Sequence, residues 1–335
     1  MPKLWEKSLR YSFLRLLCDT ACRRSYKSMK INGTLPEDGA VIIAPNHTNT
    51  LMDALVVLRT RKEPTAFGAR ADVFRKPAIA RFLRFIRIVP MVRGRDGARA
   101  VLQNRETFSE VDEVLAHGTP FCMFSEGRHR PKHSLLPIQK GIARIAFASA
   151  AKRQTWVVPT GIEYGDYFRY RESCSVTFGD PVDVNAFLKE HEGMTEADTY
   201  QAFRDLLYQR ISSLILFIPD DENYEARWAE IKPAPKKPRI GLAILLSPLF
   251  LLSAVLCLPM WALSEYINRK KLKDPAWRNT VRCMVRLFMS PLMALFWLLV
   301  LPGWWKLLGL GLFLLSYSFF YDWLNLLPSQ GIEGE

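Results

Sequence analysis

The sequence lacks the features of a disulfide-stabilised secreted protein. Its six cysteines are scattered, and none belongs to a Cys-x-x-Cys pair. We therefore expect no disulfide framework, and a reducing compartment suits the chain better. The N-terminus also lacks the uninterrupted apolar core of a cleavable signal peptide, because Glu6, Lys7, Arg10 and Arg15 fall inside it.

Acidic residues are scarce relative to basic ones. The 335-residue chain has 33 Asp and Glu against 46 Lys and Arg, which gives a formal charge of +13. Such an excess suits an anionic partner: nucleic acid, a phosphorylated metabolite or anionic lipid. Hydrophobic residues make up 49% of the chain, and much of the basic excess flanks apolar segments. This arrangement favours lipid headgroups as partners and argues against nucleic acid.

The chain shows no internal repeat of diagnostic period and no low-complexity tract. Between residues 30 and 218, short apolar runs alternate with helical segments, which predicts an α/β domain. The predicted strands cover 41–45, 65–69, 88–92, 120–124, 155–162 and 174–178, and the predicted helices cover 50–60, 77–86, 97–116, 139–152 and 196–217.

Residues 1–29 are predicted to form an amphipathic helix at a membrane interface. Basic residues lie away from a broad apolar face with a tryptophan at its edge, a pattern typical of interfacial helices. Packing of this helix on the domain is the alternative. The apolar face consists of Leu4, Trp5, Leu9, Phe13, Leu16 and Leu17.

The composition changes after a linker at 219–239, and residues 240–325 form a hydrophobic, membrane-associated region. The run 240–263 is long enough to cross a bilayer once, whereas 287–321 would be about 52 Å long as one helix and is interrupted at 302–306. The segments before and after 240–263 are both basic. We therefore expect both blocks to enter the cytoplasmic leaflet as broken hairpins, with one true span at 240–263 as the alternative. The expected location is a membrane, facing the cytoplasm of a bacterial inner membrane.

His47 lies in "PNHTNTLMDAL", between a predicted strand and a predicted helix. A neutral imidazole is the natural general base near neutral pH, and a carboxylate on its other nitrogen would hold its tautomer. Asp53, six residues further on, is a candidate for that carboxylate. A single histidine followed by an aspartate is more often structural than catalytic. Thr48 or Asn49 could simply cap the following helix.

Three further blocks follow in order. The strand "IVPMVR" ends in Arg93, and "FCMFSEGRHRP" carries Glu126 and Gly127. The continuation of that block, "LLPIQKG", leads into a helix, and "WVVPTGI" forms another strand. Each block taken alone has an ordinary structural explanation.

Together, the blocks resemble the glycerolipid acyltransferase family, the PlsC-like glycerol-3-phosphate and lysophosphatidate acyltransferases. "NHTNTLMD" matches the family's histidine–aspartate motif and "VPMVR" its second block. "FSEGRHR" with "LLPIQKG" matches the third block, and "VVPTGI" the fourth. The resemblance covers about residues 30–218 and implies a mixed sheet flanked by helices.

The resemblance implies a membrane-bound O-acyltransferase of phospholipid biosynthesis. Such an enzyme moves a fatty acyl group from acyl-CoA or acyl carrier protein to a hydroxyl of glycerol-3-phosphate or a lysophospholipid. No cofactor or metal is expected besides the acyl donor, and anionic membrane lipids are expected partners.

The resemblance also assigns roles within the blocks. His47 would be the general base oriented by Asp53, and Arg93 is a candidate for the acceptor phosphate because a guanidinium fork fits phosphate oxygens. The remaining expected acceptor-binding residues are Glu126 and Gly127, with Arg128 or Lys140 adding positive potential.

The sequence departs from the family pattern in two places. Five residues separate His47 from Asp53 where the family usually has four, and one added helical residue would rotate Asp53 by about 100°. In the third block Ser125 replaces proline, and the family's arginine aligns with His129. Arg128 or its neighbour Arg130 would then have to supply any cation needed there.

Two other classes compete with this interpretation. A metal-dependent hydrolase could use His129 and His133, but Pro131 lies between them and the spacing is not a recognised zinc pattern. A non-catalytic membrane-associated protein on an acyltransferase scaffold would explain the altered motifs.

Overall fold

The computed structural model describes residues 3–328, apart from 7, 92–97 and 235. The chain divides into two compact units. One comprises Met1–Leu16, Met29–Tyr164 and Cys174–Asp220 and is called here the catalytic unit. The other comprises Leu17–Ser28, Gly165–Ser173 and Asp221–Glu335 and is called the helical unit.

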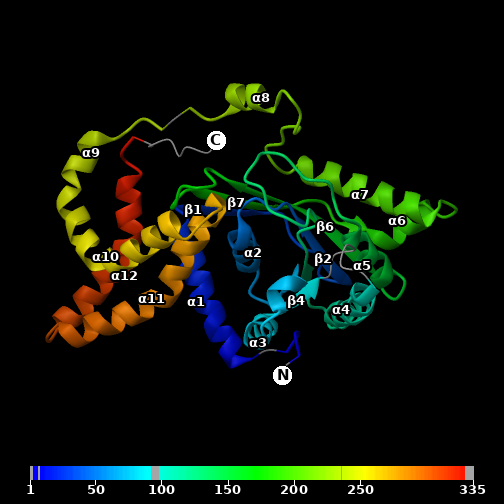
Figure 1. The fold of residues 1–335 in the computed structure, drawn as a ribbon, viewed down its shortest axis with the longest axis horizontal. Coiled ribbons are helices and arrows are strands. Elements are labelled where there is room, and N and C mark those ends of the chain that lie inside the picture. Colours follow the sequence, from blue (N-terminus) through cyan, green and yellow to red (C-terminus); the bar gives the residue numbers. More distant parts are fainter. Residues whose placement is uncertain (1–2, 7, 92–97, 235, 329–335) are drawn as a thin grey trace. The chain divides into compact units, whose positions relative to one another are not determined.

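The catalytic unit is built on a mixed sheet, as the sequence predicts. Within the described residues the sheet has eight strands in the order β1-β7-β6-β2-β5-β3-β4, with β8 paired to β6 (Figure 1). The pairs among β2, β3, β4, β5 and β6 are parallel, whereas β7 and β8 run antiparallel to β6. The strands are β1 Ser28–Asn32, β2 Ala40–Pro45, β3 Ala66–Arg70, β4 Ile88–Met91, β5 Phe121–Cys122, β6 Thr155–Tyr164, β7 Ser173–Phe178 and β8 Val182–Asp183.

Four helices cover one face of this sheet. Strand β2 is buried along its whole length, as expected for a central parallel strand, and its Ile42 joins Ile142 and Phe203 in one core. Helices α4, α5, α6 and α7 supply the rest of that core. The helices of this half of the chain are α1 Leu9–Ser25, α2 Thr50–Arg59, η1 Ala71–Phe74, α3 Pro77–Phe85, α4 Ala98–Ala116, α5 Lys140–Ala150, α6 Val184–Glu190 and α7 Glu196–Ser212.

The parallel pairing brings two motif loops to one edge of the sheet. Ile43 of β2 is paired with Cys122 of β5, so the loops that follow these strands leave the sheet side by side. One loop carries His47 and the other carries Glu126. The carboxyl edge of parallel strands is where α/β proteins commonly place a functional site.

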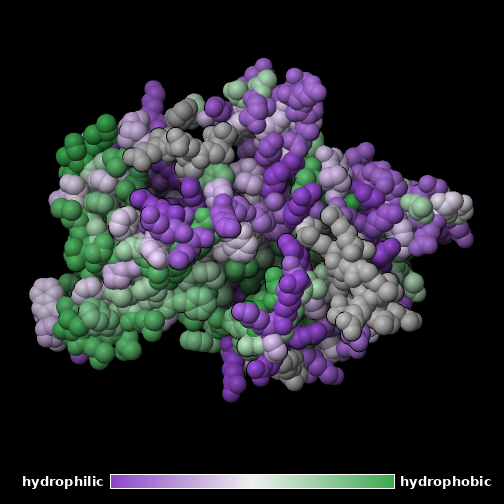
Figure 2. All heavy atoms as spheres, viewed as in Figure 1, coloured by the Kyte–Doolittle hydropathy of each residue, from purple (hydrophilic) through white to green (hydrophobic). Residues whose placement is uncertain are grey.

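The helical unit contains three long apolar helices, α10, α11 and α12. Within the described residues these are the helices long and apolar enough to cross a membrane, and Figure 2 shows a broad hydrophobic surface over them. The predicted interruption near 302–306 is confirmed. The first block is also interrupted, at Leu246 between α9 and α10, whereas α10 continues through Pro259. The elements are α8 Tyr224–Ile231, α9 Ile240–Leu245, α10 Ser247–Lys270, η2 Pro275–Trp277, α11 Arg278–Val300 and α12 Trp305–Leu324.

The two ends of this hydrophobic region meet. The backbone N–H of Arg239, just before α9, donates to the carbonyl of Leu326, just after α12, at 2.8 Å. The indole Nε1–H of Trp323 donates to the carbonyl of Ala243 at 2.9 Å. The chain therefore enters and leaves the hydrophobic region at the same place.

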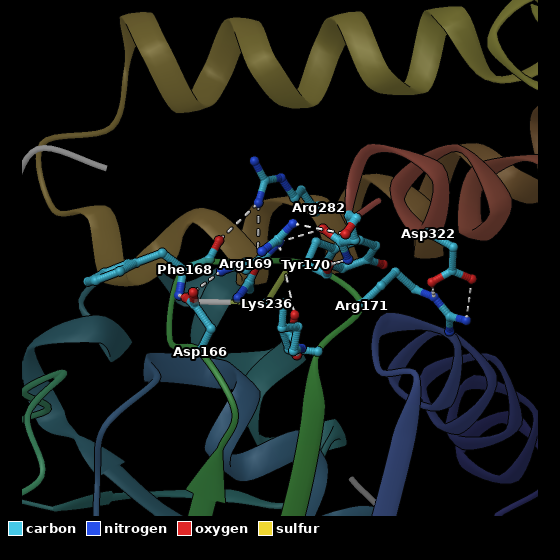
Figure 3. Close-up of polar contacts among 11 residues, drawn as sticks. Asp166, Phe168, Arg169, Tyr170, Arg171, Lys236, Arg282 and Asp322 are labelled. Carbon is cyan, nitrogen blue, oxygen red and sulfur yellow. Dashed lines mark hydrogen bonds and ion pairs between the residues drawn. The ribbon is translucent and has the colours of Figure 1, made fainter. Parts of the chain in front are cut away.

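The loop 165–173, which joins β6 to β7, is held by polar contacts inside the helical unit (Figure 3). Arg171 forms a fork on the Asp322 carboxylate, with N–O distances of 3.0 and 2.8 Å, and also donates to the carbonyl of Tyr26 at 2.6 Å. Arg169 Nε donates to Asn325 at 2.7 Å, and Asn279 at the start of α11 donates to the carbonyl of Tyr167 at 3.0 Å. The start of α11 and the end of α12 thus bind the same short loop.

Candidate active site

The sequence-predicted pair comes together in the structure. His47 Nδ1 lies 2.7 Å from Asp53 Oδ2. With Asp53 ionised, Nδ1 carries the proton and donates it in this hydrogen bond, which leaves Nε2 with a free electron pair. The His47 side chain is 17% exposed and that of Asp53 is fully buried. The arrangement is that of a histidine base held by a buried carboxylate.

Asp53 is fixed from several directions. Its Oδ2 accepts the backbone N–H groups of Thr48 and Asn49 at 2.8 and 2.7 Å. Its Oδ1 accepts the hydroxyl proton of Tyr164 at 2.6 Å. These donors compensate for the burial of the carboxylate and hold it in one orientation.

The backbone accommodates the added residue of the His47–Asp53 spacer at the start of α2. Thr50, the first residue of α2, has φ of +49°. A positive φ is uncommon for a β-branched residue, and it marks the turn between His47 and Asp53. The expected 100° misplacement of Asp53 therefore does not occur.

The loop that carries His47 is tied to its neighbours. Asn46 exchanges two side-chain hydrogen bonds with the backbone of Ile162 on β6, at 3.0 and 2.7 Å. The carbonyl of His47 accepts the Arg130 N–H at 3.0 Å. The imidazole stacks on the ring of Phe124 with 4.3 Å between centroids. Backbone and ring are thus both held in place.

Glu126 links the histidine loop to the segment before α5. Its Oε1 accepts the N–H of His47 at 2.7 Å and its Oε2 the N–H of Leu136 at 2.8 Å. Burial raises the pKa of the Glu126 carboxyl to about 7, against the lowering effect of these two backbone donors. The position of Glu126 makes it a support of His47, and its sequence-predicted contact with the acceptor stays a prediction.

Gly127 makes the turn that follows Glu126. It has φ of +74°, a conformation that costs glycine little, and a Cβ there would lie 3.4 Å from Gln139 Cγ. The N–H of Gln139 donates to the carbonyl of Ser125 at 2.8 Å, which holds the start of α5 against this turn. The Ser125 hydroxyl, where the family has proline, is buried and has no hydrogen-bond partner among the described residues.

The basic residues considered for acceptor binding fall into three groups. Arg128 and Lys140 are exposed, and neither has an ion-pair partner in the part of the chain that the structure describes. Arg130 instead pairs with Asp220, and hydrogen bonds from Arg130 and Lys132 lower the pKa of that carboxyl. Arg93 lies outside the described residues.

Sequence reasoning missed two residues of this site. Tyr164 comes from the end of β6, 111 positions after Asp53, and reaches Asp53 only through the β2–β6 pairing. Asn46 precedes His47 directly, but nothing in its type reveals that it bonds to β6. The sequence did contain one indication of Tyr164, a tyrosine at the end of the strand that contains "VVPTGI".

The metal-hydrolase alternative finds no structural counterpart. Among the described residues, no group of three or more His, Cys, Asp and Glu side chains is placed to hold a metal ion. His129 instead meets the His47 ring edge-on, with 5.6 Å between centroids.

The fold and this geometry define an α/β domain with a histidine–aspartate pair of the acyltransferase type. Residues 28–163 match the family described as Acyltransferase. These residues therefore form an acyltransferase domain, which confirms, over this part of the chain, the family predicted from the sequence.

Individual relatives are distant and match only part of the chain. Glycerol-3-phosphate O-acyltransferase 1 of Saccharomyces cerevisiae is 28% identical over 120 residues, which cover 34% of this chain and 16% of that protein. Glycerol-3-phosphate O-acyltransferase 2 of the same yeast is 32% identical over 87 residues, covering 25% and 12%. The chain thus spans less than a fifth of the length of these relatives.

One solved structure matches part of this chain. The 1-acyl-sn-glycerophosphate (LPA) acyltransferase PlsC from Thermotoga maritima aligns with a TM-score of 0.44 and 19% identity, covering 61% of this chain and 79% of that chain.

Proposed function

We propose that this protein transfers a fatty acyl group from an acyl thioester to a hydroxyl of a glycerol phosphate acceptor. The observation that carries the proposal is the 2.7 Å contact between His47 Nδ1 and the buried Asp53, which leaves Nε2 for the acceptor. The acyl donor would be acyl-CoA or acyl carrier protein. The proposed reaction invokes no further cofactor.

The first step is attack of the acceptor on the thioester. His47 Nε2 takes the proton of the acceptor hydroxyl while the hydroxyl oxygen bonds to the thioester carbonyl carbon. The carbonyl electron pair moves onto its oxygen. Asp53 stabilises the imidazolium that forms, because the carboxylate accepts the bond from its Nδ1–H.

The second step is collapse of the tetrahedral intermediate. The carbonyl reforms, the carbon–sulfur bond breaks and the thiolate takes the proton from His47 Nε2. The products are an oxygen ester and a free thiol, and His47 returns to its neutral form. Buried Tyr164 and the N–H groups of Thr48 and Asn49 keep Asp53 oriented through both steps.

Glycerol-3-phosphate is the proposed acceptor, because two of the similar yeast proteins are named for it. A lysophospholipid would suit the same base and is the second acceptor to test. Arg93 is proposed to bind the acceptor phosphate, with Arg128 and Lys140 adding positive potential and Glu126 and Gly127 shaping the acceptor site.

The release of free thiol from acyl-CoA tests the function directly. We expect release that depends on glycerol-3-phosphate or on a lysophospholipid, and a rate loss of about 10²–10⁴-fold in His47→Ala. His191→Ala is the matched control, because His191 bonds to its own helix at the carbonyl of Phe187. If His47→Ala retains most of the activity, the proposal is wrong.

The non-catalytic alternative loses its main support in this geometry. It rested on the longer spacer and on the altered third block, and the contact between His47 and Asp53 forms despite the longer spacer. The same assay decides the matter, because a non-catalytic scaffold would release no thiol with any acceptor.

A further inference from the structure

Helix α3 exposes its apolar side. The 9-residue helix contains no fully buried residue, and Ile79 and Phe82 are 44% and 49% exposed. On a helical projection these two residues lie opposite Arg84. Arg84 forms an ion pair with Glu110 of α4, so this side of α3 faces the rest of the catalytic unit.

The first half of α1 shows the same inversion. Leu9, Phe13 and Leu16 share one side of this helix and are 92%, 65% and 62% exposed. Arg15 on the opposite side is only 7% exposed and donates to the carbonyls of Leu58 and Arg61. The apolar stripe of α1 therefore points away from the catalytic unit.

The two inverted helices are neighbours (Figure 1). Arg87, just after α3, is 3% exposed and stacks over the Tyr11 ring of α1 at 3.6 Å. Arg87 also donates to the carbonyl of Glu6, ahead of α1. Arg15 of α1 and Arg87 after α3 are thus buried, whereas leucine, isoleucine and phenylalanine side chains of the two helices face outward.

In water this arrangement is unfavourable, because an amphipathic helix lowers its free energy by burying its apolar side. Outward-facing apolar sides lower the free energy only where the medium around the catalytic unit is itself apolar. A bilayer is available, because the same chain carries three helices suited to cross one and α1 continues from the catalytic unit into the helical unit.

We propose that η1–α3 is a second membrane-insertion element. Together with the neighbouring helix α1, it would anchor the catalytic unit in the interface of an anionic bilayer. Val73 of η1, 46% exposed, extends the apolar side formed by Ile79 and Phe82. Exposed Arg75, Lys76 and Arg81 border it, and basic residues at this position attract anionic headgroups.

The placement suits a lipid-handling site. Element η1 begins directly after Arg70, at the carboxyl end of β3. Strand β3 is parallel to β5, whose following loop carries Glu126, so η1 leaves the sheet at the edge that bears His47. Insertion of η1–α3 would bring this edge to the headgroup level.

A local probe tests the proposal in the full chain. Phe82→Cys, in a variant without native cysteines, is labelled with a small fluorophore and reconstituted into vesicles with brominated acyl chains. Met194→Cys is the matched control, because Met194 is 47% exposed on the connection between α6 and α7. We expect quenching at position 82 at least about twofold above that at 194. Ile79→Cys repeats the measurement should the first variant fold poorly.

Charge is tested in the same vesicles. Replacement of Arg75, Lys76 and Arg81 by glutamine should abolish the gain in quenching that anionic lipid gives over zwitterionic lipid. Equal quenching at 82 and 194 overturns the proposal. So does quenching that disappears when the protein is diluted in excess lipid, because such quenching comes from contact between copies of the protein and not from the brominated acyl chains. The readout does not involve acyl transfer, so it stands whether or not the proposed function holds.

Discussion

Tyr164 is a positioning residue at the candidate site. Its hydroxyl bonds to Asp53 at 2.6 Å, and the residue is 5% exposed, so Tyr164→Phe removes one hydrogen bond while keeping the buried ring. A hydrogen bond to a charged group contributes about 1.5–3 kcal/mol, so we expect kcat to fall roughly 10–100-fold. The half-saturating acceptor concentration should stay unchanged. Steady-state kinetics of thiol release measure both, and an unchanged kcat would show that Asp53 is held without Tyr164.

Glu126 gives the protein a stability that depends on pH. Burial raises the pKa of its carboxyl from 4.5 to about 7, so the folded chain retains a proton that the unfolded chain loses. The free energy of unfolding should therefore fall as pH rises from about 4.5 to 7, by roughly 3 kcal/mol from this group alone.

Thermal unfolding in detergent at pH 5 and pH 8 measures this effect. Glu126→Gln should show a smaller drop in Tm between the two pH values than the native chain. Exposed Glu190→Gln serves as the control and should follow the native chain. Identical pH dependence in all three proteins would rule out Glu126 as the source.

The residue types of the site can be predicted from sequence, but their geometry cannot. His47, Asp53, Glu126 and Gly127 belong to recognisable blocks, and the structure brings all four to one edge of the sheet. The φ of Thr50 depends on contacts across the loop, which no local pattern specifies. Distant partners such as Tyr164 become visible only once strand pairing is known.

At the scale of elements, the turn into α2 is the critical segment. Proline fixes φ near −65°, so Thr50→Pro cannot adopt the +49° that returns Asp53 to His47. We expect this variant to lose on the order of 10² in rate. Thr50→Asn is the matched control, because asparagine tolerates a left-handed conformation and should stay near the native rate. The thiol-release assay compares the two, and equal activity would mean that the turn does not position Asp53.

Most elements of the catalytic unit follow from hydrophobic patterning. Apolar runs predict β2 and β6 to within two residues at each end, because central strands are buried on both faces. The short β8 and α6 were missed because two and seven residues carry too little periodicity. Patterning predicted a helix over 77–86 but not the direction in which α3 turns its apolar side, because that direction depends on the partner of Arg84.

At the scale of the whole molecule, the hydrogen bond between Arg239 and Leu326 favours an even number of membrane crossings between these two residues. An odd number of crossings would separate these two residues by the bilayer. Helices α11 and α12, about 35 and 30 Å long, are each sufficient to cross the hydrocarbon core. We expect α11 to cross and α12 to return, with α10 remaining on the side of the catalytic unit.

Two exposed lysines test this topology in sealed vesicles. Lys273→Cys, between α10 and α11, should react with an impermeant thiol reagent from the side of the catalytic unit. Lys306→Cys, beside the turn between α11 and α12, should react from the opposite side. Three crossings would reverse both results, whereas hairpins confined to one leaflet would expose both cysteines on the catalytic side. Native Cys283 is buried and cannot replace these probes.

The segmental make-up of the helical unit limits how such a chain can recombine with its relatives. Arg171 comes from the connection between β6 and β7, Tyr26 from the segment after α1 and Asp322 from α12, yet the three are hydrogen-bonded together. A single crossover near residue 220 would pair one parent's membrane helices with another parent's loop 165–173. A viable hybrid must inherit residues 17–28, 165–173 and 221–335 from the same parent, so this anchor and its enzyme would diversify as one gene rather than as exchangeable modules.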